Sequence, residues 1–278
     1  MLFRSLAQYP DAVVVVQYAD GSVEKRALSS LDTDSEGRLV LSFRLNASQM
    51  TETIKVGVVF DSDNRSSTVA TSVRAYADKI LADSSYEAAH PGITELVRAM
   101  LNYGAYAQQY FGYNADDLAN KGLYTEGNDP VKNGDFSSAV AGKPVREGSV
   151  SGITPAGWTL ALDSDIKIRF YFATYNVHKY EFSVTKPDGS TVKVNADKYA
   201  DTVYRVEIGT DDASFIDETY VLNIRNIEDG SALSISFSAM MYVDTILSGG
   251  VSSTTELANV AKTIKLYCDA ADSYNQNK

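Results

Sequence analysis

The chain has 278 residues, of which 44% are hydrophobic and 22% charged, a composition typical of a globular protein. Its net charge of −11 argues against a nucleic-acid partner, because nucleic acids are bound through clustered basic residues. The single cysteine, Cys268, excludes an intrachain disulfide, and the longest apolar run, Ala12–Val16, is too short for membrane insertion.

The first half begins with residues typical of an antiparallel sheet. An apolar segment at Val13–Tyr18 is followed by Asp20-Gly21, a turn signal that favours positive φ, and by a second strand from Val23. Alternating apolar residues predict two more strands, over Leu39–Leu45 and Ile54–Val58. Strands at such short spacings indicate an antiparallel sandwich.

Two helices are predicted after these strands, over Ser72–Leu81 and Thr94–Phe111, with Thr94 as a candidate N-cap. The second helix has one apolar face, formed at steps of three and four by Leu96, Met100, Tyr103, Ala107 and Tyr110. We expect its tyrosines, Tyr103, Tyr106 and Tyr110, to lay their rings on the sheet. Gly104 weakens the helix, which indicates that another backbone approaches closely there.

Residues 114–150 separate the two halves. They contain Gly, Asp, Lys, Ser and Pro without regular apolar periodicity, which predicts a linker. The length is unusual for a free linker, so we expect it to pack along the surface of one or both halves.

The second half shows the same succession of patterns. Ile166–Ala173 alternates strictly, and Pro187–Ser190 forms a turn between apolar strands. Further strands are predicted over Tyr180–Val184, Val192–Val194, Tyr204–Ile208, Tyr220–Ile224 and Leu233–Phe237. Two helices follow, over Ser238–Leu247 and Thr254–Tyr274, with Thr254 or Thr255 as the N-cap of the second.

One pattern therefore occurs twice: Met50–Leu81 aligns with Ile216–Leu247 without a gap. Downstream, Tyr103, Ala107 and Tyr110 match Tyr267, Ala271 and Tyr274, and Cys268 takes the place of Gly104, which predicts a small buried residue. A pattern held over such a span indicates one structural unit used twice. We predict an α+β fold of two tandem homologous units, residues 1–113 and 151–278. Each would be an antiparallel β-sandwich of immunoglobulin-like size followed by a C-terminal helical hairpin.

The two copies differ at their first strand. Copy two begins with Trp158–Leu162, whereas the matching segment of copy one would precede Met1. Either residue 1 lies inside the first unit, or that unit lacks an edge strand. Because an unpaired edge invites pairing, we expect a neighbouring segment, such as part of the linker, to cover it.

The stretch Leu101–Asn114, continued by Leu118-Ala119-Asn120, carries a tyrosine-glycine-alanine theme, and Met50–Ile54 and Ser72–Asp78 accompany it. These segments resemble a repeat module of large secreted and wall-attached mosaic proteins of anaerobic Gram-positive gut bacteria. Copy two departs from the theme at Tyr267-Cys268-Asp269-Ala270. The resemblance implies an extracellular, modular and non-catalytic context, and it supplies no catalytic residues.

No catalytic constellation is evident in the sequence. His90 and His178 stand in unlike contexts, and the 36 acidic residues offer no distinguishable pair for glycoside hydrolysis. Asp32–Gly37 imitates the start of a calcium loop, but Phe43 stands where a bidentate glutamate is required. Turn chemistry explains this segment and two others, Asp61–Asn64 and Asp211-Asp212. We expect no catalytic residue, metal or cofactor, and we keep glycoside hydrolysis as a minor alternative.

We expect a non-catalytic binding, adhesion or spacer module of a multidomain bacterial surface protein, secreted or attached to the cell wall. Its partners would be other domains of the same polypeptide, cell-surface proteins or a polysaccharide. The alternative is a carbohydrate-binding module associated with glycan-degrading machinery. Its candidate glycan contacts are aromatic residues outside the core pattern: Trp158 at a strand start, Tyr175 in a strand connection and Tyr113 after a helix.

Overall fold

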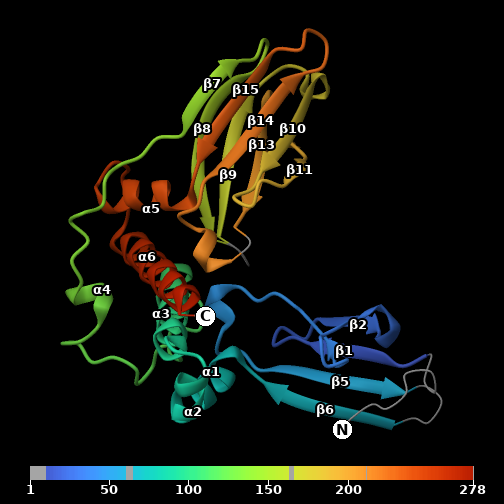
Figure 1. Cartoon of the computed structure of the whole chain (residues 1–278), viewed down its shortest axis with the longest axis vertical. Coiled ribbons are helices and arrows are strands. Elements are labelled where there is room, and N and C mark those ends of the chain that lie inside the picture. Colours follow the sequence, from blue (N-terminus) through green and yellow to red (C-terminus); the bar gives the residue numbers. More distant parts are fainter. Residues whose placement is uncertain (1–10, 61–64, 163–165, 211, 278) are drawn as a thin grey trace.

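The computed structural model describes residues 11–60, 65–162, 166–210 and 212–277. Within these ranges the fold is α+β, with six α-helices and antiparallel sheets, and the mixed class predicted above is confirmed. Two long helices, α3 (Ile93–Phe111) and α6 (Thr255–Gln276), lie side by side between the sheet of the first half and the sheets of the second (Figure 1).

The main sheet described in the first half has the order β2-β1-β5-β6. Its strands are β1 (Val13–Gln17), β2 (Val23–Ala27), β5 (Ile54–Phe60) and β6 (Arg65–Thr71). The β1–β2 turn has the predicted chemistry, since Gly21 has a φ of 85° and Asp20 accepts a hydrogen bond from the Ser22 amide at 2.8 Å. Only a small core lies under this sheet, formed by Ala12, Val14, Val16 and Leu28.

The strand expected over residues 39–45 is wrong in extent. Only Leu39–Val40 is a strand, β4, and it pairs with β3 (Asp32–Thr33). The alternating residues Leu41, Phe43 and Leu45 line a cavity beside α3. Alternation shows that one side of a segment is apolar, but it does not supply the neighbouring strand that a ladder needs.

The second half contains two larger sheets, of order β12-β13-β9-β8 and β11-β10-β14-β15-β7. The first consists of β8 (Thr154–Leu162), β9 (Ile166–Ala173), β12 (Asp197–Lys198) and β13 (Val203–Gly209). The second consists of β7 (Val145–Ser149), β10 (Tyr180–Thr185), β11 (Thr191–Val194), β14 (Tyr220–Asn226) and β15 (Ala232–Phe237). These bounds agree with the strands predicted for this half, while β7 and β12 were not anticipated.

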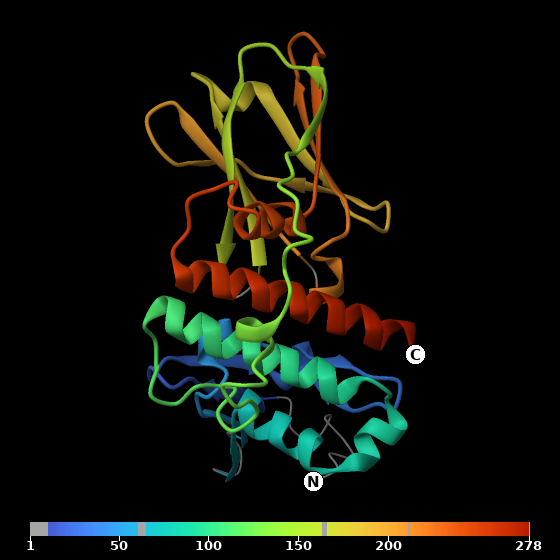
Figure 2. The same cartoon turned by 90° about the vertical axis from the view of Figure 1, so that its left-hand side faces the viewer.

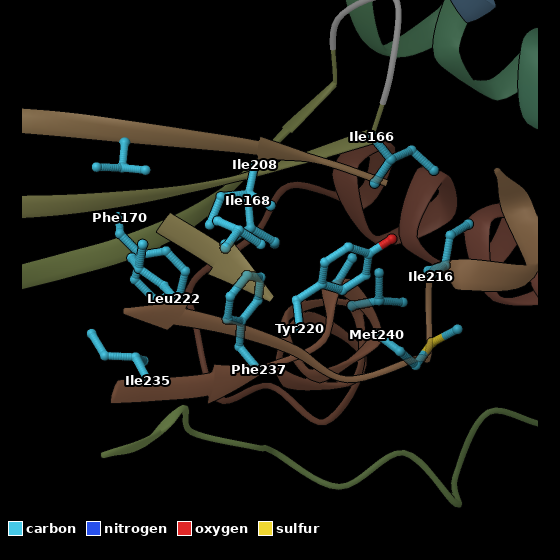
Figure 3. Packing of buried hydrophobic residues seen from close by; sticks show 14 of the residues in the cluster. Ile166, Ile168, Phe170, Ile208, Ile216, Tyr220, Leu222, Ile235, Phe237 and Met240 are labelled. Carbon is cyan, nitrogen blue, oxygen red and sulfur yellow. The ribbon is translucent and has the colours of Figure 1, made fainter. Parts of the chain in front are cut away.

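The main hydrophobic core lies between these two sheets (Figure 3). Every second residue of β9 is buried, and the opposing sheet contributes Leu222, Ile235 and Phe237. The rings of Phe170 and Phe237 pack edge to face with centroids 4.7 Å apart. Burying one such side chain stabilises a fold by roughly 1.5–3 kcal/mol, so this alternating pattern holds the two sheets together.

Residues 114–150, predicted to be a linker, end in a regular strand, β7. It pairs with β15 along Val145–Ser149 and extends the second half's sheet. A short helix, α4 (Pro130–Asn133), interrupts the same segment. The expectation that the linker would cover an edge of the first sheet is wrong for the described strand, because β7 joins the other half.

Serine N-caps fix the start of a helix after the last strand of each half. Ser72 accepts from the Ala75 amide at 3.0 Å and begins α1 (Val73–Ala82), and Ser238 accepts from the Met241 amide at 3.2 Å and begins α5 (Ala239–Leu247). A further helix, α2 (Ser84–Ala89), was not predicted.

The N-caps of the two long helices differ. Thr254 caps α6 as predicted, accepting from the Leu257 amide at 3.2 Å. Thr94 does not cap α3, because the helix begins after Gly92, whose φ is 89°. Glu87 accepts hydrogen bonds from the amides of Gly92 and Thr94 and so takes over the capping role.

Candidate functional site at the joint of the two halves

A cavity of about 570 Å³ lies where the two halves meet. One wall comes from the first half, around Met50, Met100 and Tyr103, and the other from the second half, around Ile216 and Tyr267. We call the surrounding region the joint. It consists of α3, α6 and the short 3-10 helices η3 (Ala47–Gln49) and η5 (Ala213–Phe215) that pack on them.

Two tyrosines from opposite walls meet at the joint. The rings of Tyr103 and Tyr267 are stacked, with centroids 6.1 Å apart and planes 21° apart. Burial raises the pKa of both phenols above the ordinary value. Both rings therefore stay neutral at physiological pH and contribute apolar packing. The Tyr103 ring, predicted to lie on a sheet, thus lies on the partner helix, which corrects that expectation for Tyr103. The Tyr106 hydroxyl donates to Asp129, and Tyr110 is 38% exposed.

Each wall is held by the same local link. The amide of Arg74 donates to the carbonyl of Met50 at 2.8 Å, and the amide of Met240 donates to the carbonyl of Ile216 at 2.8 Å. Met50 and Ile216 are matching positions of the repeated pattern, as are Arg74 and Met240. The start of α1 and the start of α5 are therefore fixed to the cavity walls in the same way.

Gly104 lies at the closest approach in the joint, as the sequence predicted. A Cβ atom at this position would lie 3.1 Å from the carbonyl oxygen of Ala47 and 3.2 Å from the Cβ of Ala119. A side chain would therefore force the backbone of η3 away from α3. The matching residue, Cys268, is buried, and that prediction is also confirmed.

The segment after α3 is tied to the first half. Gln108 is fully buried, and its side chain accepts from the Ala119 amide at 2.7 Å and donates to the Asp117 carbonyl at 3.0 Å. Arg74 donates to the carbonyls of Ala119 and Lys121. A buried side chain that hydrogen-bonds the amide and carbonyl groups of an irregular segment restricts the motion that a flexible linker would have.

The same segment then crosses to the second half (Figure 2). Asp129 accepts from the Tyr106 hydroxyl of α3 at 2.6 Å, and next to it Lys262 of α6 donates to the Val131 carbonyl at 3.2 Å. Further along, the Gly142 amide donates to Thr245 of α5 at 3.2 Å. Residues 114–150 thus bridge α3, α6 and α5 before they enter the sheet as β7.

A group of possible metal ligands is formed by two residues of α6 and one residue that follows η5. One ligand atom each from Asp217, Cys268 and Asp272 lies within 4.8 Å of the others. Burial and the charge of Asp217 raise the pKa values of the Cys268 thiol and the Asp272 carboxyl. These donors could hold a divalent cation, although the thiol would first have to lose its proton. Only the helical spacing of Cys268 and Asp272 was visible in the sequence.

The three predicted glycan contacts lie in different settings. Trp158 is partly buried, stacks on Phe170 at 6.2 Å and meets Tyr242 of α5 edge-on at 5.0 Å, so it packs against the core. Tyr175 is 96% exposed in the connection after β9. Tyr113 follows α3, and its hydroxyl donates to Glu52. In the β8–β9 register Trp158 pairs with Phe170, which lies five residues before Tyr175. Trp158 and Tyr175 are therefore not neighbours.

The remaining predicted features have local explanations. His90 and His178 are both exposed and lie in different halves. Asp34, in the calcium-like segment, accepts from the amides of Glu36 and Arg38, and Asp212 accepts from the Ser214 amide, as turn chemistry requires. The segment Asp61–Asn64 and residue Asp211 lie outside the described residues.

Comparisons of the chain with models of known protein families, with curated proteins and with solved structures found no match.

Proposed function

We propose that the chain is a non-catalytic extracellular binding, adhesion or spacer module of a multidomain bacterial surface protein. In this role two structural units are held in a fixed relation by the joint. The observation that carries the proposal is the packing of α3 on α6, with Tyr103 stacked on Tyr267 and residues 114–150 bonded to both helices. Such a joint suits a module that sets the distance between the partners at its two ends.

The two-unit interpretation, residues 1–113 and 151–278, is supported by the order of the strands. The succession β2-β1-β5-β6 in the first half parallels β11-β10-β14-β15 in the second. On this interpretation the second unit is an antiparallel sandwich. Among its described residues, the first unit has one four-stranded sheet and, in place of the other, the short β3–β4 pair.

The extracellular setting rests on the resemblance to secreted and wall-attached mosaic proteins. Partners would then be other domains of the same polypeptide or proteins of the cell surface. Among the helices described, none is long and apolar enough to cross a membrane.

Spin-label distance measurements test the fixed relation of the halves. Labels at Lys79→Cys and Lys193→Cys, both exposed positions, would be introduced into Cys268→Ala protein. We expect one narrow distance distribution, which the additional substitution Tyr267→Ala broadens. A pair within the second half, at Glu147→Cys and Lys193→Cys, is the control and should stay narrow in both backgrounds. A broad distribution of the distance between the two halves in the protein that retains Tyr267 would contradict the spacer role.

A second candidate function is carbohydrate binding. It is favoured by the almost complete exposure of Tyr175, because an aromatic ring held in solvent is available for stacking on a sugar. Screening the protein and its Tyr175→Ala and Trp158→Ala variants on immobilised polysaccharides tests this function. Absence of binding to every polysaccharide would remove it.

A further inference from the structure

One face of the second half combines aromatic and charged side chains on neighbouring strands. In the sheet register, Arg169 of β9 stands opposite Glu207 of β13, and Tyr171 stands opposite Arg205. The alternate residues of β9, such as Phe170, are buried in the core. Arg169 and Tyr171 therefore point away from the core, on the outer surface of the sheet β12-β13-β9-β8.

Two tyrosines provide an aromatic surface on this side. Tyr199, which follows β12, is 60% exposed and meets Tyr171 edge-on, with ring centroids 4.9 Å apart. Tyr171 also stands opposite Gly157 of the edge strand β8, where an added Cβ would meet no atom within 4 Å. The surface beside Tyr171 is thus open on one side and closed by a second ring on the other.

Hydrogen-bond donors and acceptors both lie next to these rings. Glu207 forms an ion pair with Arg169, and Arg205 Nη2 lies 3.6 Å from the other oxygen of Glu207. Partial burial opposes ionisation of Glu207, but the Arg169 hydrogen bond and the nearby positive charges outweigh it and lower its pKa. The carboxylate is an acceptor at neutral pH, and Arg205 Nε is a buried donor without a hydrogen-bond partner among the described residues.

The local charge differs from that of the whole chain. Among the described residues of β9, β12 and β13, three cations, Lys167, Arg169 and Arg205, stand on this face with two carboxylates, Glu207 and Asp197, the latter opposite Arg205. The chain as a whole carries a net charge of −11. A guanidinium recognises carboxylates by paired hydrogen bonds, so the arginines on this face favour a ligand that carries a carboxylate.

We infer that this tyrosine–arginine face, formed by Tyr171, Tyr199, Arg169, Arg205 and Glu207, is a binding site for an acidic glycan. A pyranose ring stacks on the exposed tyrosine, the sugar carboxylate pairs with Arg205, and sugar hydroxyls donate to Glu207. Among the described residues of this face, the pair of tyrosine rings stands between charged groups and not within a continuous apolar centre of the kind found in protein–protein interfaces, which suits a sugar. The inference deepens the second proposed function, because it assigns carbohydrate binding a site and a ligand class.

Calorimetric titration of the full chain with an oligogalacturonate and with a neutral oligogalactan tests the inference. We expect the acidic oligosaccharide to bind at least about tenfold more tightly, a difference of about 1.4 kcal/mol. Tyr199→Ala and Arg205→Gln should each weaken its binding about tenfold or more. Tyr76→Ala is the matched control, because Tyr76 is 58% exposed on α1 of the other half, and it should bind like the unaltered protein.

The emission of Trp158, the only tryptophan, gives a second readout from the same part of the molecule. Its neighbour Thr159 pairs with Arg169, so a ligand on this face should change the emission. Unfolding curves of each variant separate lost binding from lost fold. Absence of binding, preference for the neutral oligosaccharide, or binding unchanged by both substitutions in folded protein would each overturn the inference. None of these outcomes bears on the distance between the halves, so the spacer proposal is tested separately.

Discussion

Tyr103 and Tyr267 occupy matching positions in the repeated sequence pattern, and their rings stack on one another across the joint. A contact between equivalent residues is the arrangement found in isologous interfaces, where the same patch serves both partners. On the two-unit proposal, the halves of this chain therefore meet much as two subunits of a symmetric dimer do. The joint then depends on both rings together.

The first prediction concerns this pair. Tyr103→Ala should lower the free energy of unfolding by about 3–5 kcal/mol, because it leaves a cavity at a buried ring. The double variant with Tyr267→Ala should lose less than the sum of the single losses, by about 0.5–1.5 kcal/mol. Urea denaturation measures both values. Tyr76→Ala, at an exposed ring, should change stability by less than about 0.5 kcal/mol, and strictly additive losses at the joint would show that the two rings are not coupled.

The second prediction concerns Gly104. Gly104→Val should destabilise the protein by about 1–3 kcal/mol, because its Cβ would press on the Ala47 carbonyl and the Met50 side chain. Gly127→Val is the control, since a Cβ there meets no atom within 4 Å. Thermal unfolding compares the two variants. Equal melting temperatures of the two variants would mean that η3 can move away from α3 at Gly104 without loss of stability.

The third prediction concerns the bridge between the helices. Asp129→Ala removes the acceptor of the Tyr106 hydroxyl and the N-cap of α4, and should cost about 2–3 kcal/mol. The pKa of Tyr106, now raised by burial and by the Asp129 hydrogen bond, should fall. Ultraviolet titration measures the pKa, and hydrogen exchange at α4 should accelerate. Tyr106→Phe, which leaves the α4 cap intact, should leave exchange at α4 slow.

The fourth prediction concerns pH. Hydrogen bonds from the Ser151 hydroxyl, and from the hydroxyl and amide of Ser231, lower the pKa of Asp229 from 3.8 to about 2. Because the folded pKa lies below the unfolded value, the stabilisation is complete above pH 3.8 and is lost as the pH falls towards 2. The difference in melting temperature between Asp229→Asn and the unaltered protein should therefore shrink as the pH falls from 3.8 to about 2, the window between the unfolded and the folded pKa.

Ser151→Ala is the companion variant for this prediction. Loss of the first hydrogen bond should raise the pKa of Asp229 towards 3.8, as measured by NMR titration. A titration curve of Asp229 that is unchanged in this variant would show that the serine hydroxyl does not hold the carboxylate.

The local elements could be predicted from the sequence, because their causes lie within a few residues. Strict alternation placed β9, an Asp-Gly pair placed the β1–β2 turn, and Thr254 placed the start of α6. The sequence also identified Gly104 as a point of close approach and Cys268 as a buried position.

Which surfaces meet could not be predicted in this way and became visible in the folded chain. An apolar face in the sequence indicates that these residues will be buried, but it does not indicate which surface will cover them, since burial of apolar area is non-directional. Tyr103 therefore packs on Tyr267 where a sheet was expected, and Leu41, Phe43 and Leu45 line a cavity where a strand was expected. The tyrosine–arginine face likewise depends on the register of three strands, and that register is fixed by residues far apart in the chain.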